Sequence, residues 1–181
     1  MILGHLPAGY IISSLLLERE RDMNYRVQRR LLFWGMLCSI LPDFDLTYFY
    51  LIDNRQHLHH GYWTHLPVFW GSLAFLFYIY ALLRKKRILR LITLFGSLNV
   101  LGHLVLDTVV GKIRWIYPLS DTDVVFFHVT ARYDWWIWNL VFHWTFVFEL
   151  ALVVYAGYLF VKRRKASRNS VNCYFSWPEI S

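Results

Sequence analysis

Apolar stretches long enough to cross a membrane alternate with short basic clusters along this chain. A helix needs about 20 mostly apolar residues to cross the hydrocarbon core of a bilayer. The stretches near this length are residues 31–51, 66–83, 91–110 and 135–161. Most Lys and Arg residues fall in three clusters, at residues 19–30, 84–90 and 162–168. Because each basic cluster adjoins an apolar stretch, the net charge of +7 indicates membrane topology rather than nucleic-acid binding.

The first segment, residues 1–17, is shorter, and its positive charge follows the apolar part. A cleaved secretory signal has the reverse order and a small-residue cleavage site, so we expect a retained helix here. Basic loops mark the cytoplasmic side of a membrane protein. The sequence therefore predicts an all-α integral membrane bundle of five helices with its N-terminus outside. A single domain over residues 1–165 precedes a polar C-terminal tail, residues 166–181.

Ionisable residues recur at one depth of these expected helices. Each of four lies thirteen or fourteen residues from a basic cluster, and they are His5, Asp43, His103 and Glu149. At about 1.5 Å per residue, this spacing places all four about 20 Å from the cytoplasmic boundary, in the outer half of the membrane. A lone charge near the bilayer centre costs about 2.5–3.5 kcal/mol on insertion scales. Several such costs at one depth favour a single shared site.

The spacing of these residues favours a metal site. His103 and Asp107 are four residues apart, so both side chains project from one helix face and can hold one cation. The motif LPDFDL adds Asp43 and Asp45, which would point in nearly opposite directions on a regular helix. Both can bind only if Pro42 interrupts the helix. Otherwise one binds metal and the other orients a ligand.

The predicted outer loop over residues 52–65 is rich in histidine. Its motif HLHHGYWTHLP holds His57, His59, His60 and His65. Mixed imidazole and carboxylate ligands favour Zn²⁺, with Mn²⁺ or Fe²⁺ as alternatives, over Ca²⁺, which prefers oxygen ligands. The candidate ligands are too many for one tetrahedral zinc: His5, Asp43, Asp45, His60, His65, His103 and Asp107. Two ions are therefore plausible, and a pair of close cations suits in-line attack on a phosphate.

Five motifs follow one another in order between residues 3 and 123: GHLPAGY, LPDFDL, HHGYWTHLPVFW, GHLVLDT and WIYPLSD. Together they resemble the YdjM-type family of membrane-bound metal-dependent hydrolases. This family is also described as LexA-binding and inner-membrane-associated, and it is distantly similar to zinc-dependent phospholipase C. The resemblance implies a helical metal site with His5, Asp43, His60, His65, His103 and Asp107 as ligands. Family members often carry Arg-Gly after the first histidine of the loop motif, and this chain does not, which leaves the role of His59 open.

The sequence thus predicts a metal-dependent hydrolase of the bacterial inner membrane, with its site towards the outer face. We expect a metal-activated water to cleave a phosphoester or related bond in a lipid or lipid-linked substrate. Asp45 or Glu149 is the candidate general base, and Arg114 and Arg132 are candidate contacts for a phosphate or for lipid headgroups. The expected partner is the lipid bilayer, and nucleic acid is not expected.

Two other classes of function remain open. A metal-ion transporter would continue its polar path through the cytoplasmic half of the helices, which offers mainly serines. A membrane scaffold with a structural metal would have a closed coordination shell, whereas a catalytic site keeps an open position.

Overall fold

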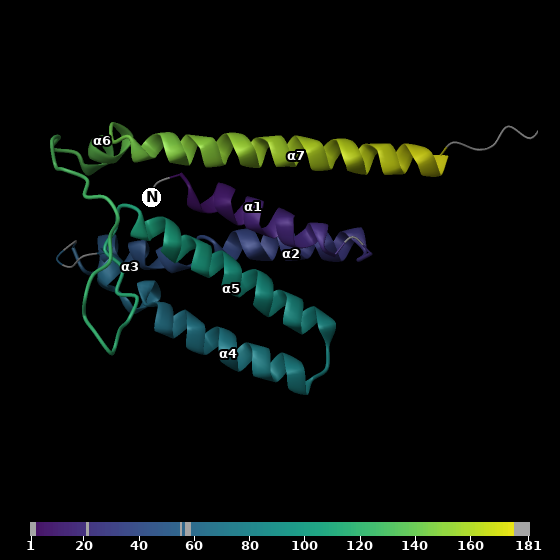
Figure 1. Ribbon diagram of the computed structural model, residues 1–181, viewed down its shortest axis with the longest axis horizontal. Coiled ribbons are helices and arrows are strands. Elements are labelled where there is room, and N and C mark those ends of the chain that lie inside the picture. The colour runs from purple at the N-terminus through teal and green to yellow at the C-terminus, as the bar shows by residue number, and fades with distance from the viewer. Residues whose placement is uncertain (1–2, 21, 55, 57–58, 176–181) are drawn as a thin grey trace, which may run out of the picture.

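The chain is all-helical in a computed structural model, which describes residues 3–20, 22–54, 56 and 59–175 (Figure 1). Those residues form seven α-helices and three short 3₁₀ helices, with no β-strand. The elements are α1 (His5–Glu18), α2 (Tyr25–Cys38), η1 (Pro42–Phe44), α3 (Asp45–Leu51), η2 (His59–Gly61), η3 (Trp63–His65), α4 (Pro67–Leu83), α5 (Arg87–Thr108), α6 (Trp136–Val141) and α7 (Thr145–Phe175). The expected all-α class is confirmed.

Two of the apolar stretches of the sequence, residues 31–51 and 135–161, are each divided between two α-helices. α2 begins inside a basic cluster, where the Asn24 side chain accepts the N–H of Arg26 and so caps the helix. It ends at Cys38, and the 3₁₀ turn that begins at Pro42 separates it from α3, so residues 31–51 are not one helix. The last stretch is likewise divided between α6 and α7. α7 continues to Phe175, through the first part of the expected tail, and residues 176–181 lie outside the described chain.

The five longer helices run roughly side by side (Figure 1). α1 packs against α2, α5 and α7, while α4 packs against the opposite side of α5. α3, α6 and the long loop over residues 109–135 gather at one end, which we call the loop end. The three basic clusters lie towards the other end, which we call the basic end. Basic segments that alternate with apolar ones in the sequence are thus gathered at one end of the helices in the fold.

Two helices are long and apolar enough to cross a bilayer, α5 and residues 145–165 of α7. α4 is apolar but has 17 residues. α1 and α2 have 14 residues each, or about 21 Å at a rise of 1.5 Å per residue, against a hydrocarbon core of about 30 Å. The number of membrane crossings therefore stays a prediction.

A tight polar contact joins α1, α2 and α5 midway along the bundle. The buried Asn99 amide donates to Ser13 Oγ (3.1 Å) and to the carbonyl oxygen of Phe95 (2.7 Å). A Cβ on Gly35 would overlap both Ser13 Oγ and Asn99 Nδ2, so only glycine permits this approach. The helices are closely packed at this level, between the two ends of the bundle.

Candidate metal centre

Imidazole and carboxylate groups from six elements, α1, η1, α3, η2, η3 and α5, converge at the loop end. On α5, His103 Nε2 lies 3.0 Å from Asp107 Oδ2, so the two residues do share one helix face as their spacing indicates. His5 begins α1, and its Nε2 lies 3.1 Å from Asp107 Oδ1. The His5 ring also stacks on the His103 ring, with centroids 3.9 Å apart. We define the His/Asp cluster as His5, Asp43, Asp45, His59, His60, His65, His103 and Asp107.

The interruption at Pro42 brings both aspartates of the LPDFDL motif to the cluster. Asp43 lies in the 3₁₀ turn, with its Oδ1 3.3 Å from His59 Nε2. Asp45 begins α3, and its Oδ2 lies 3.0 Å from His65 Nδ1. A regular helix would have turned one of the two carboxylates away.

Four donor atoms in the cluster have the mutual spacing that one metal ion requires. They belong to Asp43, His65, His103 and Asp107 and all lie within 4.8 Å of one another. His65 Nε2 and His103 Nε2 are 3.5 Å apart, each is 3.7 Å from Asp43 Oδ1, and Asp107 Oδ2 lies 3.5 and 3.0 Å from them. Ligands bound at about 2.0–2.2 Å to a tetrahedral Zn²⁺ lie about 3.3–3.6 Å apart. The four residues therefore fit a divalent cation.

Hydrogen bonds outside this set orient both imidazoles. His103 Nδ1 lies 2.8 Å from the carbonyl oxygen of Ser39, which can only accept, so Nδ1 carries the proton and Nε2 faces the cluster with its lone pair. His65 Nδ1 bonds Asp45, and the Thr64 hydroxyl donates to the same carboxylate oxygen. A carboxylate behind a ligating histidine fixes the ring and raises its basicity. Of the two roles considered for Asp45, the geometry favours orienting a ligand.

Two further histidines of the loop motif complete the cluster. His60 Nε2 lies 3.6 Å from Asp107 Oδ2, and His59, His60 and His65 form a second group with donor atoms within 4.8 Å of one another. A Cβ on Gly111 would overlap the His60 ring, so the glycine allows this close approach. His57, the remaining histidine of the motif, lies outside the described residues.

His59 is the cluster residue whose role the sequence left open. Its Nε2 lies 3.3 Å from Asp43 Oδ1 and its Nδ1 lies 3.2 Å from Asp45 Oδ1, so it bridges the two aspartates. The signal for it was its place beside His60 in the histidine-rich loop. The path of the histidine-rich loop, which the sequence does not specify, determines which carboxylates His59 and His60 contact.

The two carboxylates at the centre use both of their oxygens. Asp107 Oδ1 faces His5, while Oδ2 faces His103, His65 and His60. Asp43 divides its oxygens in the same way, with Oδ2 4.0 Å from His5 and Oδ1 towards the other rings. Bridging carboxylates of this kind can hold two neighbouring cations.

The negative charge of the neighbouring aspartates favours the protonated form of His59 and His65 in the metal-free protein. Burial lowers the pKa of His59, but the hydrogen bonds that the ring donates to Asp43 and Asp45 outweigh it and raise the pKa above its ordinary value. The same balance between burial and carboxylate hydrogen bonds raises the pKa of His65. A cation that takes these nitrogens must displace their protons, so metal binding is coupled to pH.

The cluster is sealed on one side and open on the other. The side chains of His65, His103 and Asp107 are at most 1% exposed, whereas those of Asp43 and His60 are 24% and 25% exposed. Arg114 lies beside the open edge, because its Nη2 donates to the carbonyl of Gly61 at 2.7 Å. The site therefore has an edge that a molecule can approach, with a guanidinium next to it.

Comparison with known proteins now assigns the chain to a family. The family model described as YdjM inner membrane protein matches residues 1–169. The chain belongs to the YdjM inner membrane protein family. Searches among curated proteins and among solved structures gave no match. Membership agrees with the two membrane-capable helices and confirms the resemblance carried by the motifs.

Within this YdjM-family protein, Glu149 lies beside the cluster rather than among the candidate metal-binding groups that the described residues form. It is 3% exposed on α7, and its Oε2 accepts the backbone N–H groups of Leu3 and Gly4, directly before His5. Glu149 and His5, which the sequence places at one depth, therefore lie close together. The observed contacts connect α7 to the start of α1, which carries His5.

Proposed function

We propose that this YdjM-family protein is a membrane-bound metal-dependent hydrolase that cleaves a phosphoester or related bond in a lipid or lipid-linked molecule. The observation that carries the proposal is the buried His/Asp cluster with one accessible edge. Burying this many ionisable groups is costly unless they serve one another or a bound cation. A partly open site favours chemistry over a purely structural metal, whose coordination shell is closed.

Asp43, His65, His103 and Asp107 would hold the first cation, and His5 with the second oxygens of the two aspartates favours a place for another. When bound, such a cation supplies Lewis-acid polarisation of the phosphoryl group and lowers the pKa of water. Zn²⁺ is the ion that this mixture of imidazole and carboxylate suits best, with Mn²⁺ or Fe²⁺ as alternatives.

The residues of the chain itself would orient the ligands and move protons. Asp45 holds His65, and it also contacts His59 on its other oxygen. His59, 17% exposed, bridges from this carboxylate towards the accessible edge. A histidine held by a carboxylate can take a proton at one nitrogen while the carboxylate stabilises the resulting charge. We therefore propose the Asp45–His59 pair as the general base in the metal-bound protein, where a cation on Asp43 would leave His59 Nε2 free to take a proton and Asp45 would hold the other nitrogen.

The surroundings of the open edge support an anionic, lipid-like substrate. Arg114 is positioned there by its bond to Gly61 and can receive a phosphate oxygen. Large apolar side chains are exposed beside the histidine-rich loop, including Trp63 in η3 and Val68 at the start of α4. In an inner membrane protein such surfaces suit contact with acyl chains. A substrate with a phosphate headgroup and an acyl chain would match both features.

The packing beneath the cluster argues against transport of the metal. A transporter needs a continuous polar path to the basic end. Buried polar residues do continue below the cluster, at Ser39, Asn99 and Ser13. However, Asn99 bonds Ser13 and even a Cβ on Gly35 would overlap both, so the helices are packed too closely there for an ion. The closed middle of the bundle favours a site that is reached from the loop end alone.

We further propose five membrane crossings, formed by α1, α2, α4, α5 and α7. The three basic clusters share one end of these helices, and positive loops favour the cytoplasm. This orientation places the cluster towards the outer face of the inner membrane.

The test is hydrolysis by purified protein in neutral detergent. We expect release of phosphate or a phosphorylated headgroup from at least one of three probes: phosphatidic acid, phosphatidylglycerol and a polyprenyl diphosphate. Treatment with a chelator should abolish the release, and Zn²⁺ or Mn²⁺ should restore it. His103→Ala should be inactive, because it removes a nitrogen from the four-residue set.

The matched control is His128→Ala, which removes an exposed histidine outside the cluster and should retain activity. Turnover that survives both the chelator and His103→Ala would refute metal-dependent catalysis at this cluster. Metal-loaded protein that cleaves none of the three lipid classes would refute the proposed substrate.

A further inference from the structure

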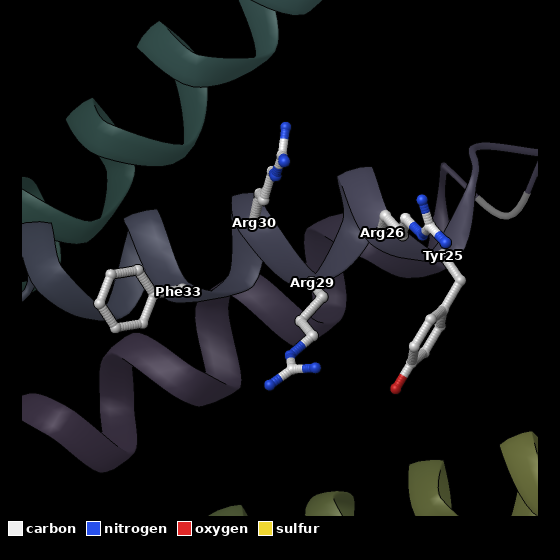
Figure 2. Close-up of a pocket in the computed structure, with 5 residues that line it drawn as sticks. All are labelled: Tyr25, Arg26, Arg29, Arg30 and Phe33. Carbon is white, nitrogen blue, oxygen red and sulfur yellow. The ribbon is translucent and has the colours of Figure 1, made fainter.

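A second concave surface lies on the first half of α2, on the part of the helix towards the basic end. A hollow of about 530 Å³ is lined by Tyr25, Arg26, Arg29, Arg30 and Phe33 (Figure 2). Ser39, which bonds His103, is nine residues beyond Arg30, or about 13 Å along a helical rise. The hollow is therefore separate from the His/Asp cluster.

The lining residues form one stripe along the helix. Arg26, Arg30 and Phe33 follow a spacing of four and three residues, which places them on one helix face, with Arg29 beside them. Figure 2 shows Arg29 and Arg30 extending to opposite sides, so that the stripe presents guanidinium groups across its width. Tyr25 and Phe33 are 65% and 69% exposed, so their rings also face outwards.

The three guanidinium groups have no carboxylate partner among the described residues. Elsewhere the structure pairs arginines with acids, as in Arg87 with Glu20 and Arg114 with Asp121. Arg26 and Arg30 are instead a like-charged pair one helical turn apart, which disfavours the helix. An anion between them would remove this repulsion.

The order of charge and apolarity along α2 indicates which anion fits. A guanidinium group can donate two parallel hydrogen bonds to one phosphate, and three guanidinium groups lie within about one and a half turns of α2. The aromatic Phe33 follows on the side of the apolar part of the helix, where Leu31 begins the hydrophobic stretch. A phosphate followed by a hydrocarbon chain, in that order, is the structure of a phospholipid. A soluble phosphate would match the arginines but not the exposed ring.

We propose that this hollow binds an anionic phospholipid of the same membrane, with its phosphate between Arg26 and Arg30, which share one helix face, and an acyl chain against Phe33. Arg29 adds positive charge beside them (Figure 2). Anionic lipids concentrate at the cytoplasmic surface and attract basic segments there. The site does not depend on the proposed hydrolase activity, because no cluster residue lines it. It holds a bound lipid at the basic end of the bundle.

The test compares two triple variants of the full chain that each lose three positive charges. Arg26→Gln/Arg29→Gln/Arg30→Gln changes the hollow. The control, Arg84→Gln/Lys86→Gln/Arg90→Gln, changes exposed residues at the start of α5 and in the turn before it. Native mass spectrometry and thermal unfolding, after delipidation, measure binding of phosphatidylglycerol, with phosphatidylcholine as the zwitterionic reference.

We expect the wild type and the control to bind phosphatidylglycerol and to unfold at higher temperature with it. The hollow variant should bind at least about tenfold more weakly, and Phe33→Ala should also weaken lipid binding. Equal affinity of the two triple variants would overturn the proposal. So would equal stabilisation by inorganic phosphate, which would identify a soluble anion as the ligand. If the hollow variant does not fold, Arg30→Gln alone is compared with Arg90→Gln.

Discussion

The two ends of the bundle use charged residues in opposite ways. At the loop end, imidazoles and carboxylates alternate in a cluster whose central side chains are nearly inaccessible. At the basic end, arginines of α2 are exposed and have no acidic partner among the described residues. Buried charges must be paired, whereas exposed ones are satisfied by water or by a loosely held anion. A substitution of a charged residue should therefore change stability and metal binding strongly at the loop end, whereas at the basic end it should change stability only slightly.

The largest effect is expected for Asp107→Asn. Asp107 contacts His5 through one oxygen and three other histidines through the second, so loss of its charge affects every proposed ligand ring. We predict a fall in turnover of about a thousandfold or more, equivalent to about 4 kcal/mol, together with a lower unfolding temperature.

Asp123→Asn is the matched control for this substitution, because Asp123 is exposed in the loop over residues 109–135 and lies outside the cluster. It should keep both activity and stability. An Asp107→Asn protein that retains wild-type turnover would show that the buried end tolerates charge loss as the exposed end does.

A smaller effect is expected for Asp45→Asn, because Asp45 acts through His65. The amide can still bond the ring, but it no longer stabilises the ring charge or raises its basicity. Removing such a supporting group weakens metal binding by about 10–100-fold. Competition with a chromophoric chelator measures this affinity. An unchanged affinity would show that His65 does not need Asp45 to bind metal. Complete loss of metal would indicate that Asp45 is a direct ligand.

Acid should weaken metal binding at the loop end. The neighbouring carboxylates raise the pKa of His59 above its ordinary value and that of His65 to about 11, so both rings keep their protons to higher pH than a free imidazole does. Each ring that binds metal must release its proton, and affinity should fall by about tenfold per pH unit for each proton released. Isothermal titration in buffers of different ionisation enthalpy measures the number of protons. Binding without proton release between pH 6 and 8 would contradict the inferred charge state.

The smallest effect in this series is expected for Glu149→Gln. A glutamine oxygen can still accept the N–H groups of Leu3 and Gly4, so the start of α1 should stay in place. We predict metal content and turnover within about threefold of wild type, and a lower unfolding temperature for Glu149→Ala, which removes the acceptor. A tenfold or greater fall in Glu149→Gln, with normal expression, would instead support the alternative role of Glu149 as base or ligand.

The sequence predicts the cluster well where a local rule applies. The four-residue spacing of His103 and Asp107 places them on one face, and the distance of His5 from its basic cluster places it at the same depth. These inferences need only the regular rise and turn of a helix. Asp43 and Asp45 can both reach the cluster only if Pro42 interrupts the helix. The sequence indicated this possibility, but only the structure shows that the interruption occurs.

Other features depend on contacts that no sequence pattern specifies. The bridging position of His59 follows from the path of a loop, and local spacing gives no rule for it. The observed partners of Glu149 are backbone N–H groups, which every residue carries, so the identities of Leu3 and Gly4 gave no signal. The start of α2 among arginines is set by the Asn24 cap rather than by hydrophobicity, and it moves the helix boundary six residues from the apolar stretch.

The metal content of purified protein tests the central claim most directly. Elemental analysis should find at least one Zn, Mn or Fe ion per chain in the wild type and in His128→Ala. The double variant His65→Ala/His103→Ala removes two of the four donor atoms and should contain less than about a tenth as much. Full metal occupancy in the double variant, or no divalent metal in wild-type protein produced in metal-supplemented medium, would contradict a metal centre at the His/Asp cluster.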